Sequence, residues 1–111
     1  AKKYTAPEGE LLVAVEDEKV VGMVAYHRHS KSRCEMKRLY VKPKYRENKL
    51  GKKLVLEILG HAKKAGYREM VLDTIIPLQS AIYLYKKVGF VECEAYYHNP
   101  MDDVLYFKKI L

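Results

Sequence analysis

The feature of the sequence that most constrains the fold is a change in the spacing of its apolar residues. Three short apolar runs come first, at residues 11–16, 20–29 and 33–41, with the length and composition of β-strands. From residue 50 onward the spacing is that of an amphipathic helix, with apolar residues four positions apart. These residues are Leu50, Leu54, Ile58 and Ala62. Strands and helices of this kind each bury one side, so the chain must place helices against a sheet.

The rest of the chain repeats this alternation. Residues 70–75 predict a fourth strand, and a second helix is expected from about Pro77, whose ring suits a first helical turn. Two final strands are expected at about 91–98 and 103–110. The short polar connection at residues 17–19 predicts that the first two strands form an antiparallel hairpin.

This order predicts an α/β fold with a mixed, mostly antiparallel sheet and a central parallel strand–helix–strand crossover. With 111 residues the chain can build one core, so we expect a single domain over residues 1–111. Asn48 is the predicted N-cap of the first helix. Gly66 and Gly89 are predicted to end the two helices in the left-handed conformation.

Composition narrows the classes of function. The net charge of +7 favours anionic ligands, although a solvated basic surface explains it equally well. The chain has no recognition motif for nucleic acid and no apolar run near the ~20 residues that cross a bilayer, so neither nucleic acid nor a membrane is predicted as a partner.

Cys34 and Cys93 stand outside any CxxC motif and no signal peptide opens the chain, so we expect both cysteines to be free thiols and the protein to be cytoplasmic. His27 and His29 share a strand face with no fourth ligand at suitable spacing, and no metal is predicted.

The stretch from Leu39 to Leu54 carries the strongest chemical signal. A strand runs through a polar loop into the first turn of a helix, and Gly51 lies inside that turn. A glycine costs a helix ~1 kcal/mol relative to alanine, and close approach of a ligand is one reason to keep it. Helix N-termini bind phosphate groups, and Arg46 and three lysines add positive charge here. The alternative is a tolerated glycine beside a solvated basic turn.

Two motifs in this sequence resemble those of the GNAT superfamily of N-acetyltransferases. The segment from Arg46 to Gly51 is similar to the signature Arg/Gln-x-x-Gly-x-Gly/Ala, and residues 81–90 resemble the later motif A-x-x-LY-x-K-x-GF. The resemblance covers residues 11–111. It implies transfer of acetyl from acetyl-coenzyme A, as co-substrate and without a metal, to a primary amine of a small molecule or peptide. Direct attack would take place in a ternary complex.

The resemblance also implies which residues bind coenzyme A. The backbones of Leu39 and Val41 would pair with the pantetheine arm, like an added strand. Amides around Gly51 would hold the diphosphate, Lys87 could reach a phosphate, and the oxyanion would use an N–H of residues 39–41. The full implied set is Leu39, Tyr40, Val41, Arg46, Glu47, Asn48, Lys49, Leu50, Gly51, Lys52 and Lys87.

Two residues depart from the family pattern. Lys49 replaces the first signature glycine: a helical Lys49 could point outward and help bind phosphates, but a close approach at this position would weaken binding. Leu78 stands where many members carry asparagine, which removes one polar contact to the cofactor. These departures keep open a second function, a non-catalytic coenzyme A-binding or regulatory module. A basic nucleic-acid binder is a third.

For catalysis the resemblance points to Glu35 and Tyr85. Glu35 lies four residues before Leu39, where histone-acetylating members carry a base, but it could equally be an exposed carboxylate paired with Lys37 or Arg33. Tyr85 holds the position of a general acid for the departing thiolate, and its alternative is a core aromatic residue. A further group, Tyr96, Tyr97 and His98, could line an acceptor pocket or be ordinary strand residues.

Full GNAT domains usually begin with a strand and two helices before the first strand seen here. Residues 1–10 cannot supply them, so the hairpin at residues 11–29 is expected to have an uncovered edge. Long exposed edges pair with other chains, and a homodimer through this edge is therefore predicted. A truncated chain with poor acceptor binding is the alternative.

Overall fold

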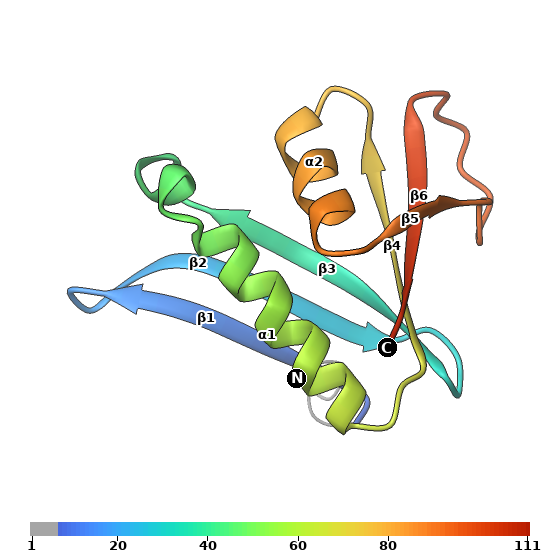
Figure 1. Ribbon diagram of the computed structural model, residues 1–111, viewed down its shortest axis with the longest axis horizontal. Coiled ribbons are helices and arrows are strands. Elements are labelled where there is room, and N and C mark those ends of the chain that lie inside the picture. Colours follow the sequence, from blue (N-terminus) through green and yellow to red (C-terminus); the bar gives the residue numbers. More distant parts are fainter. Residues whose placement is uncertain (1–6) are drawn as a thin grey trace.

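The computed structural model describes residues 7–111 as one sheet with two α-helices packed on it (Figure 1). The elements in chain order are β1 (Gly9–Glu16), β2 (Lys19–Arg28), β3 (Arg33–Val41), a 3₁₀ helix η2 (Pro43–Asn48), α1 (Leu50–Lys64), β4 (Glu69–Ile75), α2 (Gln79–Lys87), β5 (Val91–Cys93) and β6 (Val104–Ile110). The described strands lie in the order β1-β2-β3-β4-β6-β5. Only the β3–β4 pair is parallel. The predicted mixed α/β fold with a parallel crossover is confirmed.

The core lies between the helices and one face of the sheet. The residues that join the core cluster alternate along the strands, as in Cys34 and Met36 on β3, or Met70 and Leu72 on β4. Helix α1 covers β1, β2 and β3 and contributes Val55 and Ile58, both without exposed surface, while α2 lies beside β4 (Figure 1). Burying such an aliphatic side chain contributes roughly 1.5–3 kcal/mol. The periodic stripe in the sequence therefore marked the buried side of α1 correctly.

The opposite side of the sheet, which we call the helix-free face, carries the residues between these core positions. On β3 they are Glu35 and Lys37, on β4 Asp73, and on β6 Tyr106. Within the described residues no helix packs on this face; the irregular segment 94–103 lies over part of it. The two faces therefore differ in chemistry, with an apolar core on one and ionisable groups on the other.

Both helices end at the predicted glycines. Gly66 has φ 101° and Gly89 has φ 105°, the left-handed conformation that glycine adopts without strain. After α2 the Gly89 amide donates to Lys86 O (3.1 Å) and the Phe90 amide to Tyr85 O (2.9 Å), the pair of bonds of a Schellman ending. Both predictions of the helix ends are confirmed. They could be made from the sequence because each depends on residues within one turn of the helix end.

The predicted helix starts are wrong by one or two residues. Asn48 is not the N-cap of α1; it ends η2, which Pro43 opens because a proline has no amide to leave unpaired. Lys49 is the N-cap instead. Pro77 likewise precedes α2, which begins at Gln79 with Leu78 as N-cap.

The predicted strand at 91–98 is also wrong in length. β5 ends at Cys93 and has only β6 as a neighbour, since it forms the edge of the sheet. Tyr96 and Tyr97 turn their hydroxyls to Glu35 and Asp73 across the helix-free face. These side-chain bonds replace the strand ladder that the alternating residues suggested.

The parallel strands β3 and β4 separate after a short paired section. Their register runs only from Arg33↔Glu69 to Glu35↔Val71. Farther along, β3 carries a bulge: Lys37 pairs with Ala25 and Tyr40 with Met23, so two residues of β3 face one of β2. Arg38, inside the bulge, has φ 58°. Bulges bend and twist a strand, and here β3 diverges from β4 toward its carboxyl end (Figure 1).

Candidate active site

A cleft of about 800 Å³ lies where β3 and β4 have parted. The end of β3, the start of α1 and one side of α2 form its walls. Eight of the predicted cofactor residues line it: Leu39, Tyr40, Val41, Arg46, Lys49, Gly51, Lys52 and Lys87. Residues 77–81, Tyr83 and Leu84 complete the lining. Two motifs whose first residues lie 35 positions apart in the sequence (Arg46 and Ala81) therefore contribute to one cavity.

The start of α1 leaves backbone amides open to the cleft. Among the side chains that the structure describes, none caps this N-terminus, and the first helical bond runs from the Lys53 amide to Lys49 O (3.1 Å). The amides of Leu50, Gly51 and Lys52 precede that bond and have no acceptor within the helix. A helix start of this kind carries a partial positive charge, which suits an anion.

Gly51 keeps this helix start free of side-chain bulk. A Cβ built there would lie 3.4 Å from Leu84 Cδ2 and 3.7 Å from Val41 Cγ2, which are ordinary van der Waals distances. The fold therefore has room for a small side chain at this position. Such a side chain would stand among residues that line the cleft and would occupy space next to the free amides.

Lys49 occupies a position that only glycine adopts without strain. Its φ of 59° and ψ of 20° are left-handed, so the helical arrangement considered from the sequence does not occur. A left-handed non-glycine residue costs roughly 1–2 kcal/mol. The side chain is exposed and lines the cleft, where its charge faces the same space as that of Lys52.

Arg46 fastens the loop that presents these amides. Its Nε donates to Val41 O at 3.0 Å, which ties η2 back to the end of β3. Leu50, also predicted to bind the cofactor, is not among the lining residues and instead packs against the core. The backbones of Glu47 and Asn48 belong to η2, and their side chains lie outside the described residues.

Tyr85 is buried in the core and does not line the cleft. It is 7% exposed, and its ring lies 5.9 Å from that of Phe90 and 6.4 Å from that of Phe107. Burial, with a smaller contribution from the charge of Asp73, raises the pKa of Tyr85 to about 12. The phenol therefore keeps its proton at neutral pH. Tyr85 directly follows Leu84, which does line the cleft.

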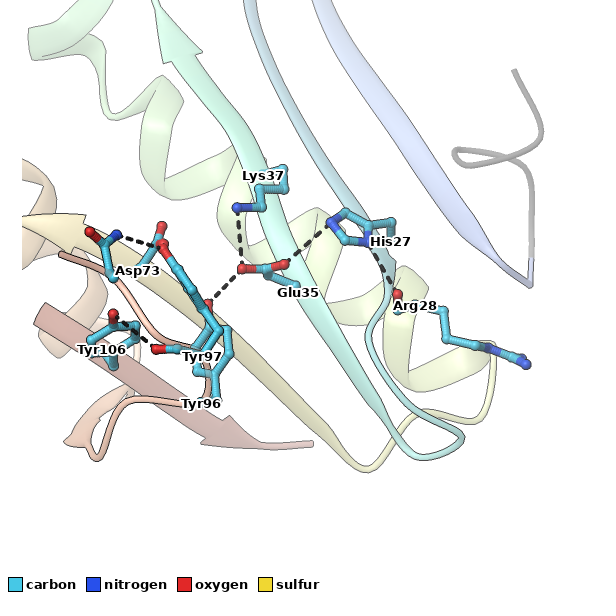
Figure 2. Close-up of polar contacts among 9 residues, drawn as sticks. His27, Arg28, Glu35, Lys37, Asp73, Tyr96, Tyr97 and Tyr106 are labelled. Carbon is cyan, nitrogen blue, oxygen red and sulfur yellow. Dashed lines mark hydrogen bonds and ion pairs between the residues drawn. The ribbon is translucent and has the colours of Figure 1, made fainter. Parts of the chain in front are cut away.

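Glu35 lies at the last paired position of β3 and β4, on the helix-free face. It is 6% exposed and makes three polar contacts, with His27, Lys37 and Tyr96 (Figure 2). The alternative of an exposed carboxylate is therefore wrong, although the pairing with Lys37 (3.2 Å) is present. Arg33 pairs with Glu69 instead.

A group of tyrosines beside Glu35 was only loosely indicated by the sequence. The Tyr97 hydroxyl donates to Asp73, and the rings of Tyr96, Tyr97 and Tyr106 lie 5.3–5.5 Å apart (Figure 2). Burial, then the hydrogen bond to Glu35, raises the pKa of Tyr96 above that of an ordinary phenol. The sequence signal for this group was the pair of adjacent tyrosines, Tyr96 and Tyr97, before the Asn99-Pro100 turn.

The histidines do not form a metal site with their neighbours. Among the side chains that the structure describes, no group of three or more from His, Cys, Asp or Glu could hold a metal ion. Cys34 belongs to the core on the helix side of the sheet, away from His27. His29 instead packs edge-on against the Tyr96 ring at 5.2 Å, and His98 is exposed.

Comparison with known proteins decides the family. The model of the acetyltransferase (GNAT) family matches residues 2–90. The chain belongs to this family. An uncharacterised N-acetyltransferase of Schizosaccharomyces pombe is 47% identical over 109 residues, which is 96% of this chain and 67% of that protein. An uncharacterised N-acetyltransferase of Dictyostelium discoideum is 47% identical over 77 residues, which is 69% of this chain but only 36% of the relative.

Solved structures agree with this family assignment. The PaiA N-acetyltransferase of Thermoplasma acidophilum, in complex with coenzyme A, superposes with a TM-score of 0.82 at 26% identity. The match covers 94% of this chain and 62% of that one. The cleft described above therefore lies in a fold that, in a relative, holds coenzyme A. No helix within residues 7–111 is long and apolar enough to cross a membrane.

Proposed function

We propose that this chain transfers an acetyl group from acetyl-coenzyme A to a primary amine of a small molecule or peptide, by direct attack in a ternary complex. One observation carries the proposal: the uncapped start of α1, flanked by cationic side chains, opens into the same cleft as the parted edge of β3. A ligand that carries a diphosphate and an extended arm with amide groups would bind the helix start through the diphosphate and the edge of β3 through the arm. Coenzyme A is a molecule of this shape.

The donor would lie along the cleft in an extended conformation. The backbone of Leu39 and Val41 has no β4 partner in the register and can pair with the two amides of pantetheine. The amides of residues 46–52 then hold the diphosphate, and Lys87, at the far wall of the cleft, takes a phosphate of the nucleotide. An N–H of residues 39–41 is our proposed donor to the tetrahedral oxyanion.

Glu35 and Tyr85 are the proposed catalytic groups. The acceptor reaches the enzyme as an ammonium ion, and Glu35 removes its proton, directly or through water. Tyr85, buried directly behind the cleft-lining Leu84, is the proposed donor to the departing thiolate. Full proton transfer from a phenol whose pKa is about 12 to a thiolate near 8.5 would be uphill by about 5 kcal/mol. Tyr85 therefore acts by donating a hydrogen bond to the sulfur.

Calorimetry with acetyl-coenzyme A, followed by a thiol-release screen, tests the proposal. The screen covers simple amines, polyamines, amino acids and peptide N-termini. We expect saturable binding and release of coenzyme A with a subset of these amines. Binding without release from any amine would instead favour a non-catalytic module, and the absence of binding would refute both.

We also propose that the outer edge of β1 is covered in a homodimer. β1 is an edge strand, and its residues Leu11, Val13 and Val15 are 44%, 49% and 59% exposed. A long apolar edge of this kind pairs readily with another strand. Antiparallel pairing of two β1 strands would satisfy the outward-facing backbone N–H and C=O groups of β1 on both copies.

A further inference from the structure

One side of α2 faces the cleft along its whole length. Four of the lining residues recur at the spacing of a single helix face, and they are Ser80, Tyr83, Leu84 and Lys87. The opposite side of the helix carries Ile82 and Tyr85, which are buried in the core. Side chains on the cleft side of α2 are therefore available to a ligand that lies in the cleft.

Leu84 fixes how far this side of α2 lies from the proposed diphosphate site. A Cβ built on Gly51 would lie 3.4 Å from Leu84 Cδ2, so α2 passes directly beside the free amides at the start of α1. Tyr83 precedes Leu84 in the chain, and Lys87 follows it by three residues on the same side of the helix. A ligand whose diphosphate binds the start of α1 would therefore bring its next chemical group against Tyr83 and Lys87.

Tyr83 presents an open aromatic surface to this group. It is 68% exposed, and Lys87 Nζ lies 5.8 Å from the centre of its ring. Exposed aromatic rings stack on nucleobases, because every base has a π-face. A lysine beside the ring supplies a charge for a phosphate. The two side chains together therefore fit a base and a phosphate that belong to one nucleotide.

The positive charges of the cleft lie in two places. Arg46, Lys49 and Lys52 line the end near the start of α1, and Lys87 lines the α2 side. None of the lining residues that the structure describes is acidic. This distribution suits a ligand with phosphate groups at two points along its length. Coenzyme A is such a ligand, with a diphosphate between pantetheine and ribose and a further phosphate on the ribose 3′-oxygen.

We infer that Tyr83 stacks on the adenine of the donor and that Lys87 binds its 3′-phosphate, so that this chain selects thioesters of coenzyme A over the same thioesters of phosphopantetheine. The inference rests on the proposed function, because it needs the diphosphate at the start of α1. Stacking of a base on an aromatic side chain changes affinity by about five- to a hundredfold. Carrier proteins hold acyl groups on phosphopantetheine, so this selection separates free donors from carrier-bound ones.

Calorimetry with two donors tests the stacking. The probes are acetyl-coenzyme A and S-acetyl-4′-phosphopantetheine, which lacks the nucleotide. We expect Tyr83→Ala to weaken binding of acetyl-coenzyme A by about five- to a hundredfold and to leave binding of the shorter donor within about twofold. Tyr83→Phe keeps the ring and should bind both donors like the wild type. Equal weakening of both donors by Tyr83→Ala, or no weakening of either, would overturn the inference.

The same measurement with acetyl-3′-dephospho-coenzyme A tests Lys87. Lys87→Ala should weaken binding of acetyl-coenzyme A by about three- to fivefold and leave binding of the dephospho form within about twofold. Lys86 is the matched control, since it is exposed on the same helix and does not line the cleft. Lys86→Ala should change neither affinity. Equal losses in Lys86→Ala and Lys87→Ala would show attraction by overall charge and refute the contact with the 3′-phosphate.

Fluorescence detects the stacked base directly. The chain contains no tryptophan, so Tyr83→Trp introduces a single indole. A stacked adenine quenches indole emission, and we expect acetyl-coenzyme A to lower this emission while S-acetyl-4′-phosphopantetheine leaves it unchanged. Unchanged emission in a variant that calorimetry shows to bind acetyl-coenzyme A would overturn the inference.

The wild-type affinities separate this inference from the proposed function. We expect acetyl-coenzyme A to bind at least tenfold more tightly than S-acetyl-4′-phosphopantetheine. Equal affinity for the two donors would remove the inference alone and leave the proposed function standing. If neither donor bound, the proposed function would fail, and the inference would fail with it.

Discussion

Replacing Gly51 by aspartate should strengthen the fold and weaken donor binding at the same time. The new Cβ meets only Leu84 and Val41, at 3.4 and 3.7 Å, so no backbone shift is needed. An aspartate forms a helix a few tenths of a kcal/mol better than glycine, and a carboxylate in the first turn gains about 0.3–1 kcal/mol from the helix dipole. The free energy of unfolding should therefore rise by about 1 kcal/mol.

The same carboxylate opposes an anion at the helix start. At about 5 Å from one charge of a diphosphate, and with an effective dielectric constant near 20, the repulsion is about 3 kcal/mol. The dissociation constant for acetyl-coenzyme A should therefore increase roughly a hundredfold.

Urea unfolding and calorimetry measure the two effects, and Gly60→Asp is the matched control. Gly60 lies in the same helix, is exposed, and has nothing within 4 Å of a built Cβ. Gly60→Asp makes the same chemical change outside the donor cleft and should bind acetyl-coenzyme A as tightly as the wild type. Equal affinity of Gly51→Asp and Gly60→Asp would refute a diphosphate at the start of α1. A Gly51→Asp protein that unfolds more easily would contradict the uncapped helix start.

Three further substitutions test other parts of the molecule. Lys49→Gly should raise the free energy of unfolding by about 0.5–1 kcal/mol, because relief of left-handed strain exceeds the extra entropy that glycine loses on folding. Urea unfolding of Lys49→Gly and Lys49→Ala measures this effect, and a lower urea midpoint for Lys49→Gly would contradict it. Tyr85→Phe should lower kcat at least tenfold and leave the dissociation constant for acetyl-coenzyme A within about twofold; unchanged turnover in steady-state kinetics would remove Tyr85 from the mechanism. Val13→Glu should convert a dimer to a monomer in size-exclusion chromatography with light scattering, and a wild-type monomer would already disprove pairing through β1.

Local patterns in the sequence predicted most of the fold. The four-residue stripe identified α1, and the glycines at 66 and 89 identified both helix ends, because each signal acts within one or two turns of chain. The motif from Arg46 to Gly51 contains three of the eight predicted residues that line the cleft, and the family resemblance supplied the other five. Sequence patterns therefore predict best those elements whose conformation depends on residues close to them in the chain.

The surroundings of Glu35 depend on contacts that no local pattern contains. Tyr96 and Glu35 are 61 residues apart in the sequence, and their bond forms only once segment 94–103 leaves the strand direction. The left-handed conformation of Lys49 was equally hidden, since lysine has no preference for it and the surrounding structure imposes it. The surroundings of Glu35 were therefore predicted only as alternatives, and the left-handed conformation of Lys49 was not predicted.

The bulge at Arg38 has a consequence for how this site could be gained or lost. One additional residue in β3 is what sets two residues opposite one of β2 and turns the strand away from β4. Removing Arg38 would leave Leu39 alone opposite Val24, and the regular ladder could continue beside β4 to close the donor's entrance. Deletion of a single codon would then be enough to close the gap between β3 and β4 where the donor is proposed to enter, although every proposed catalytic side chain would be retained.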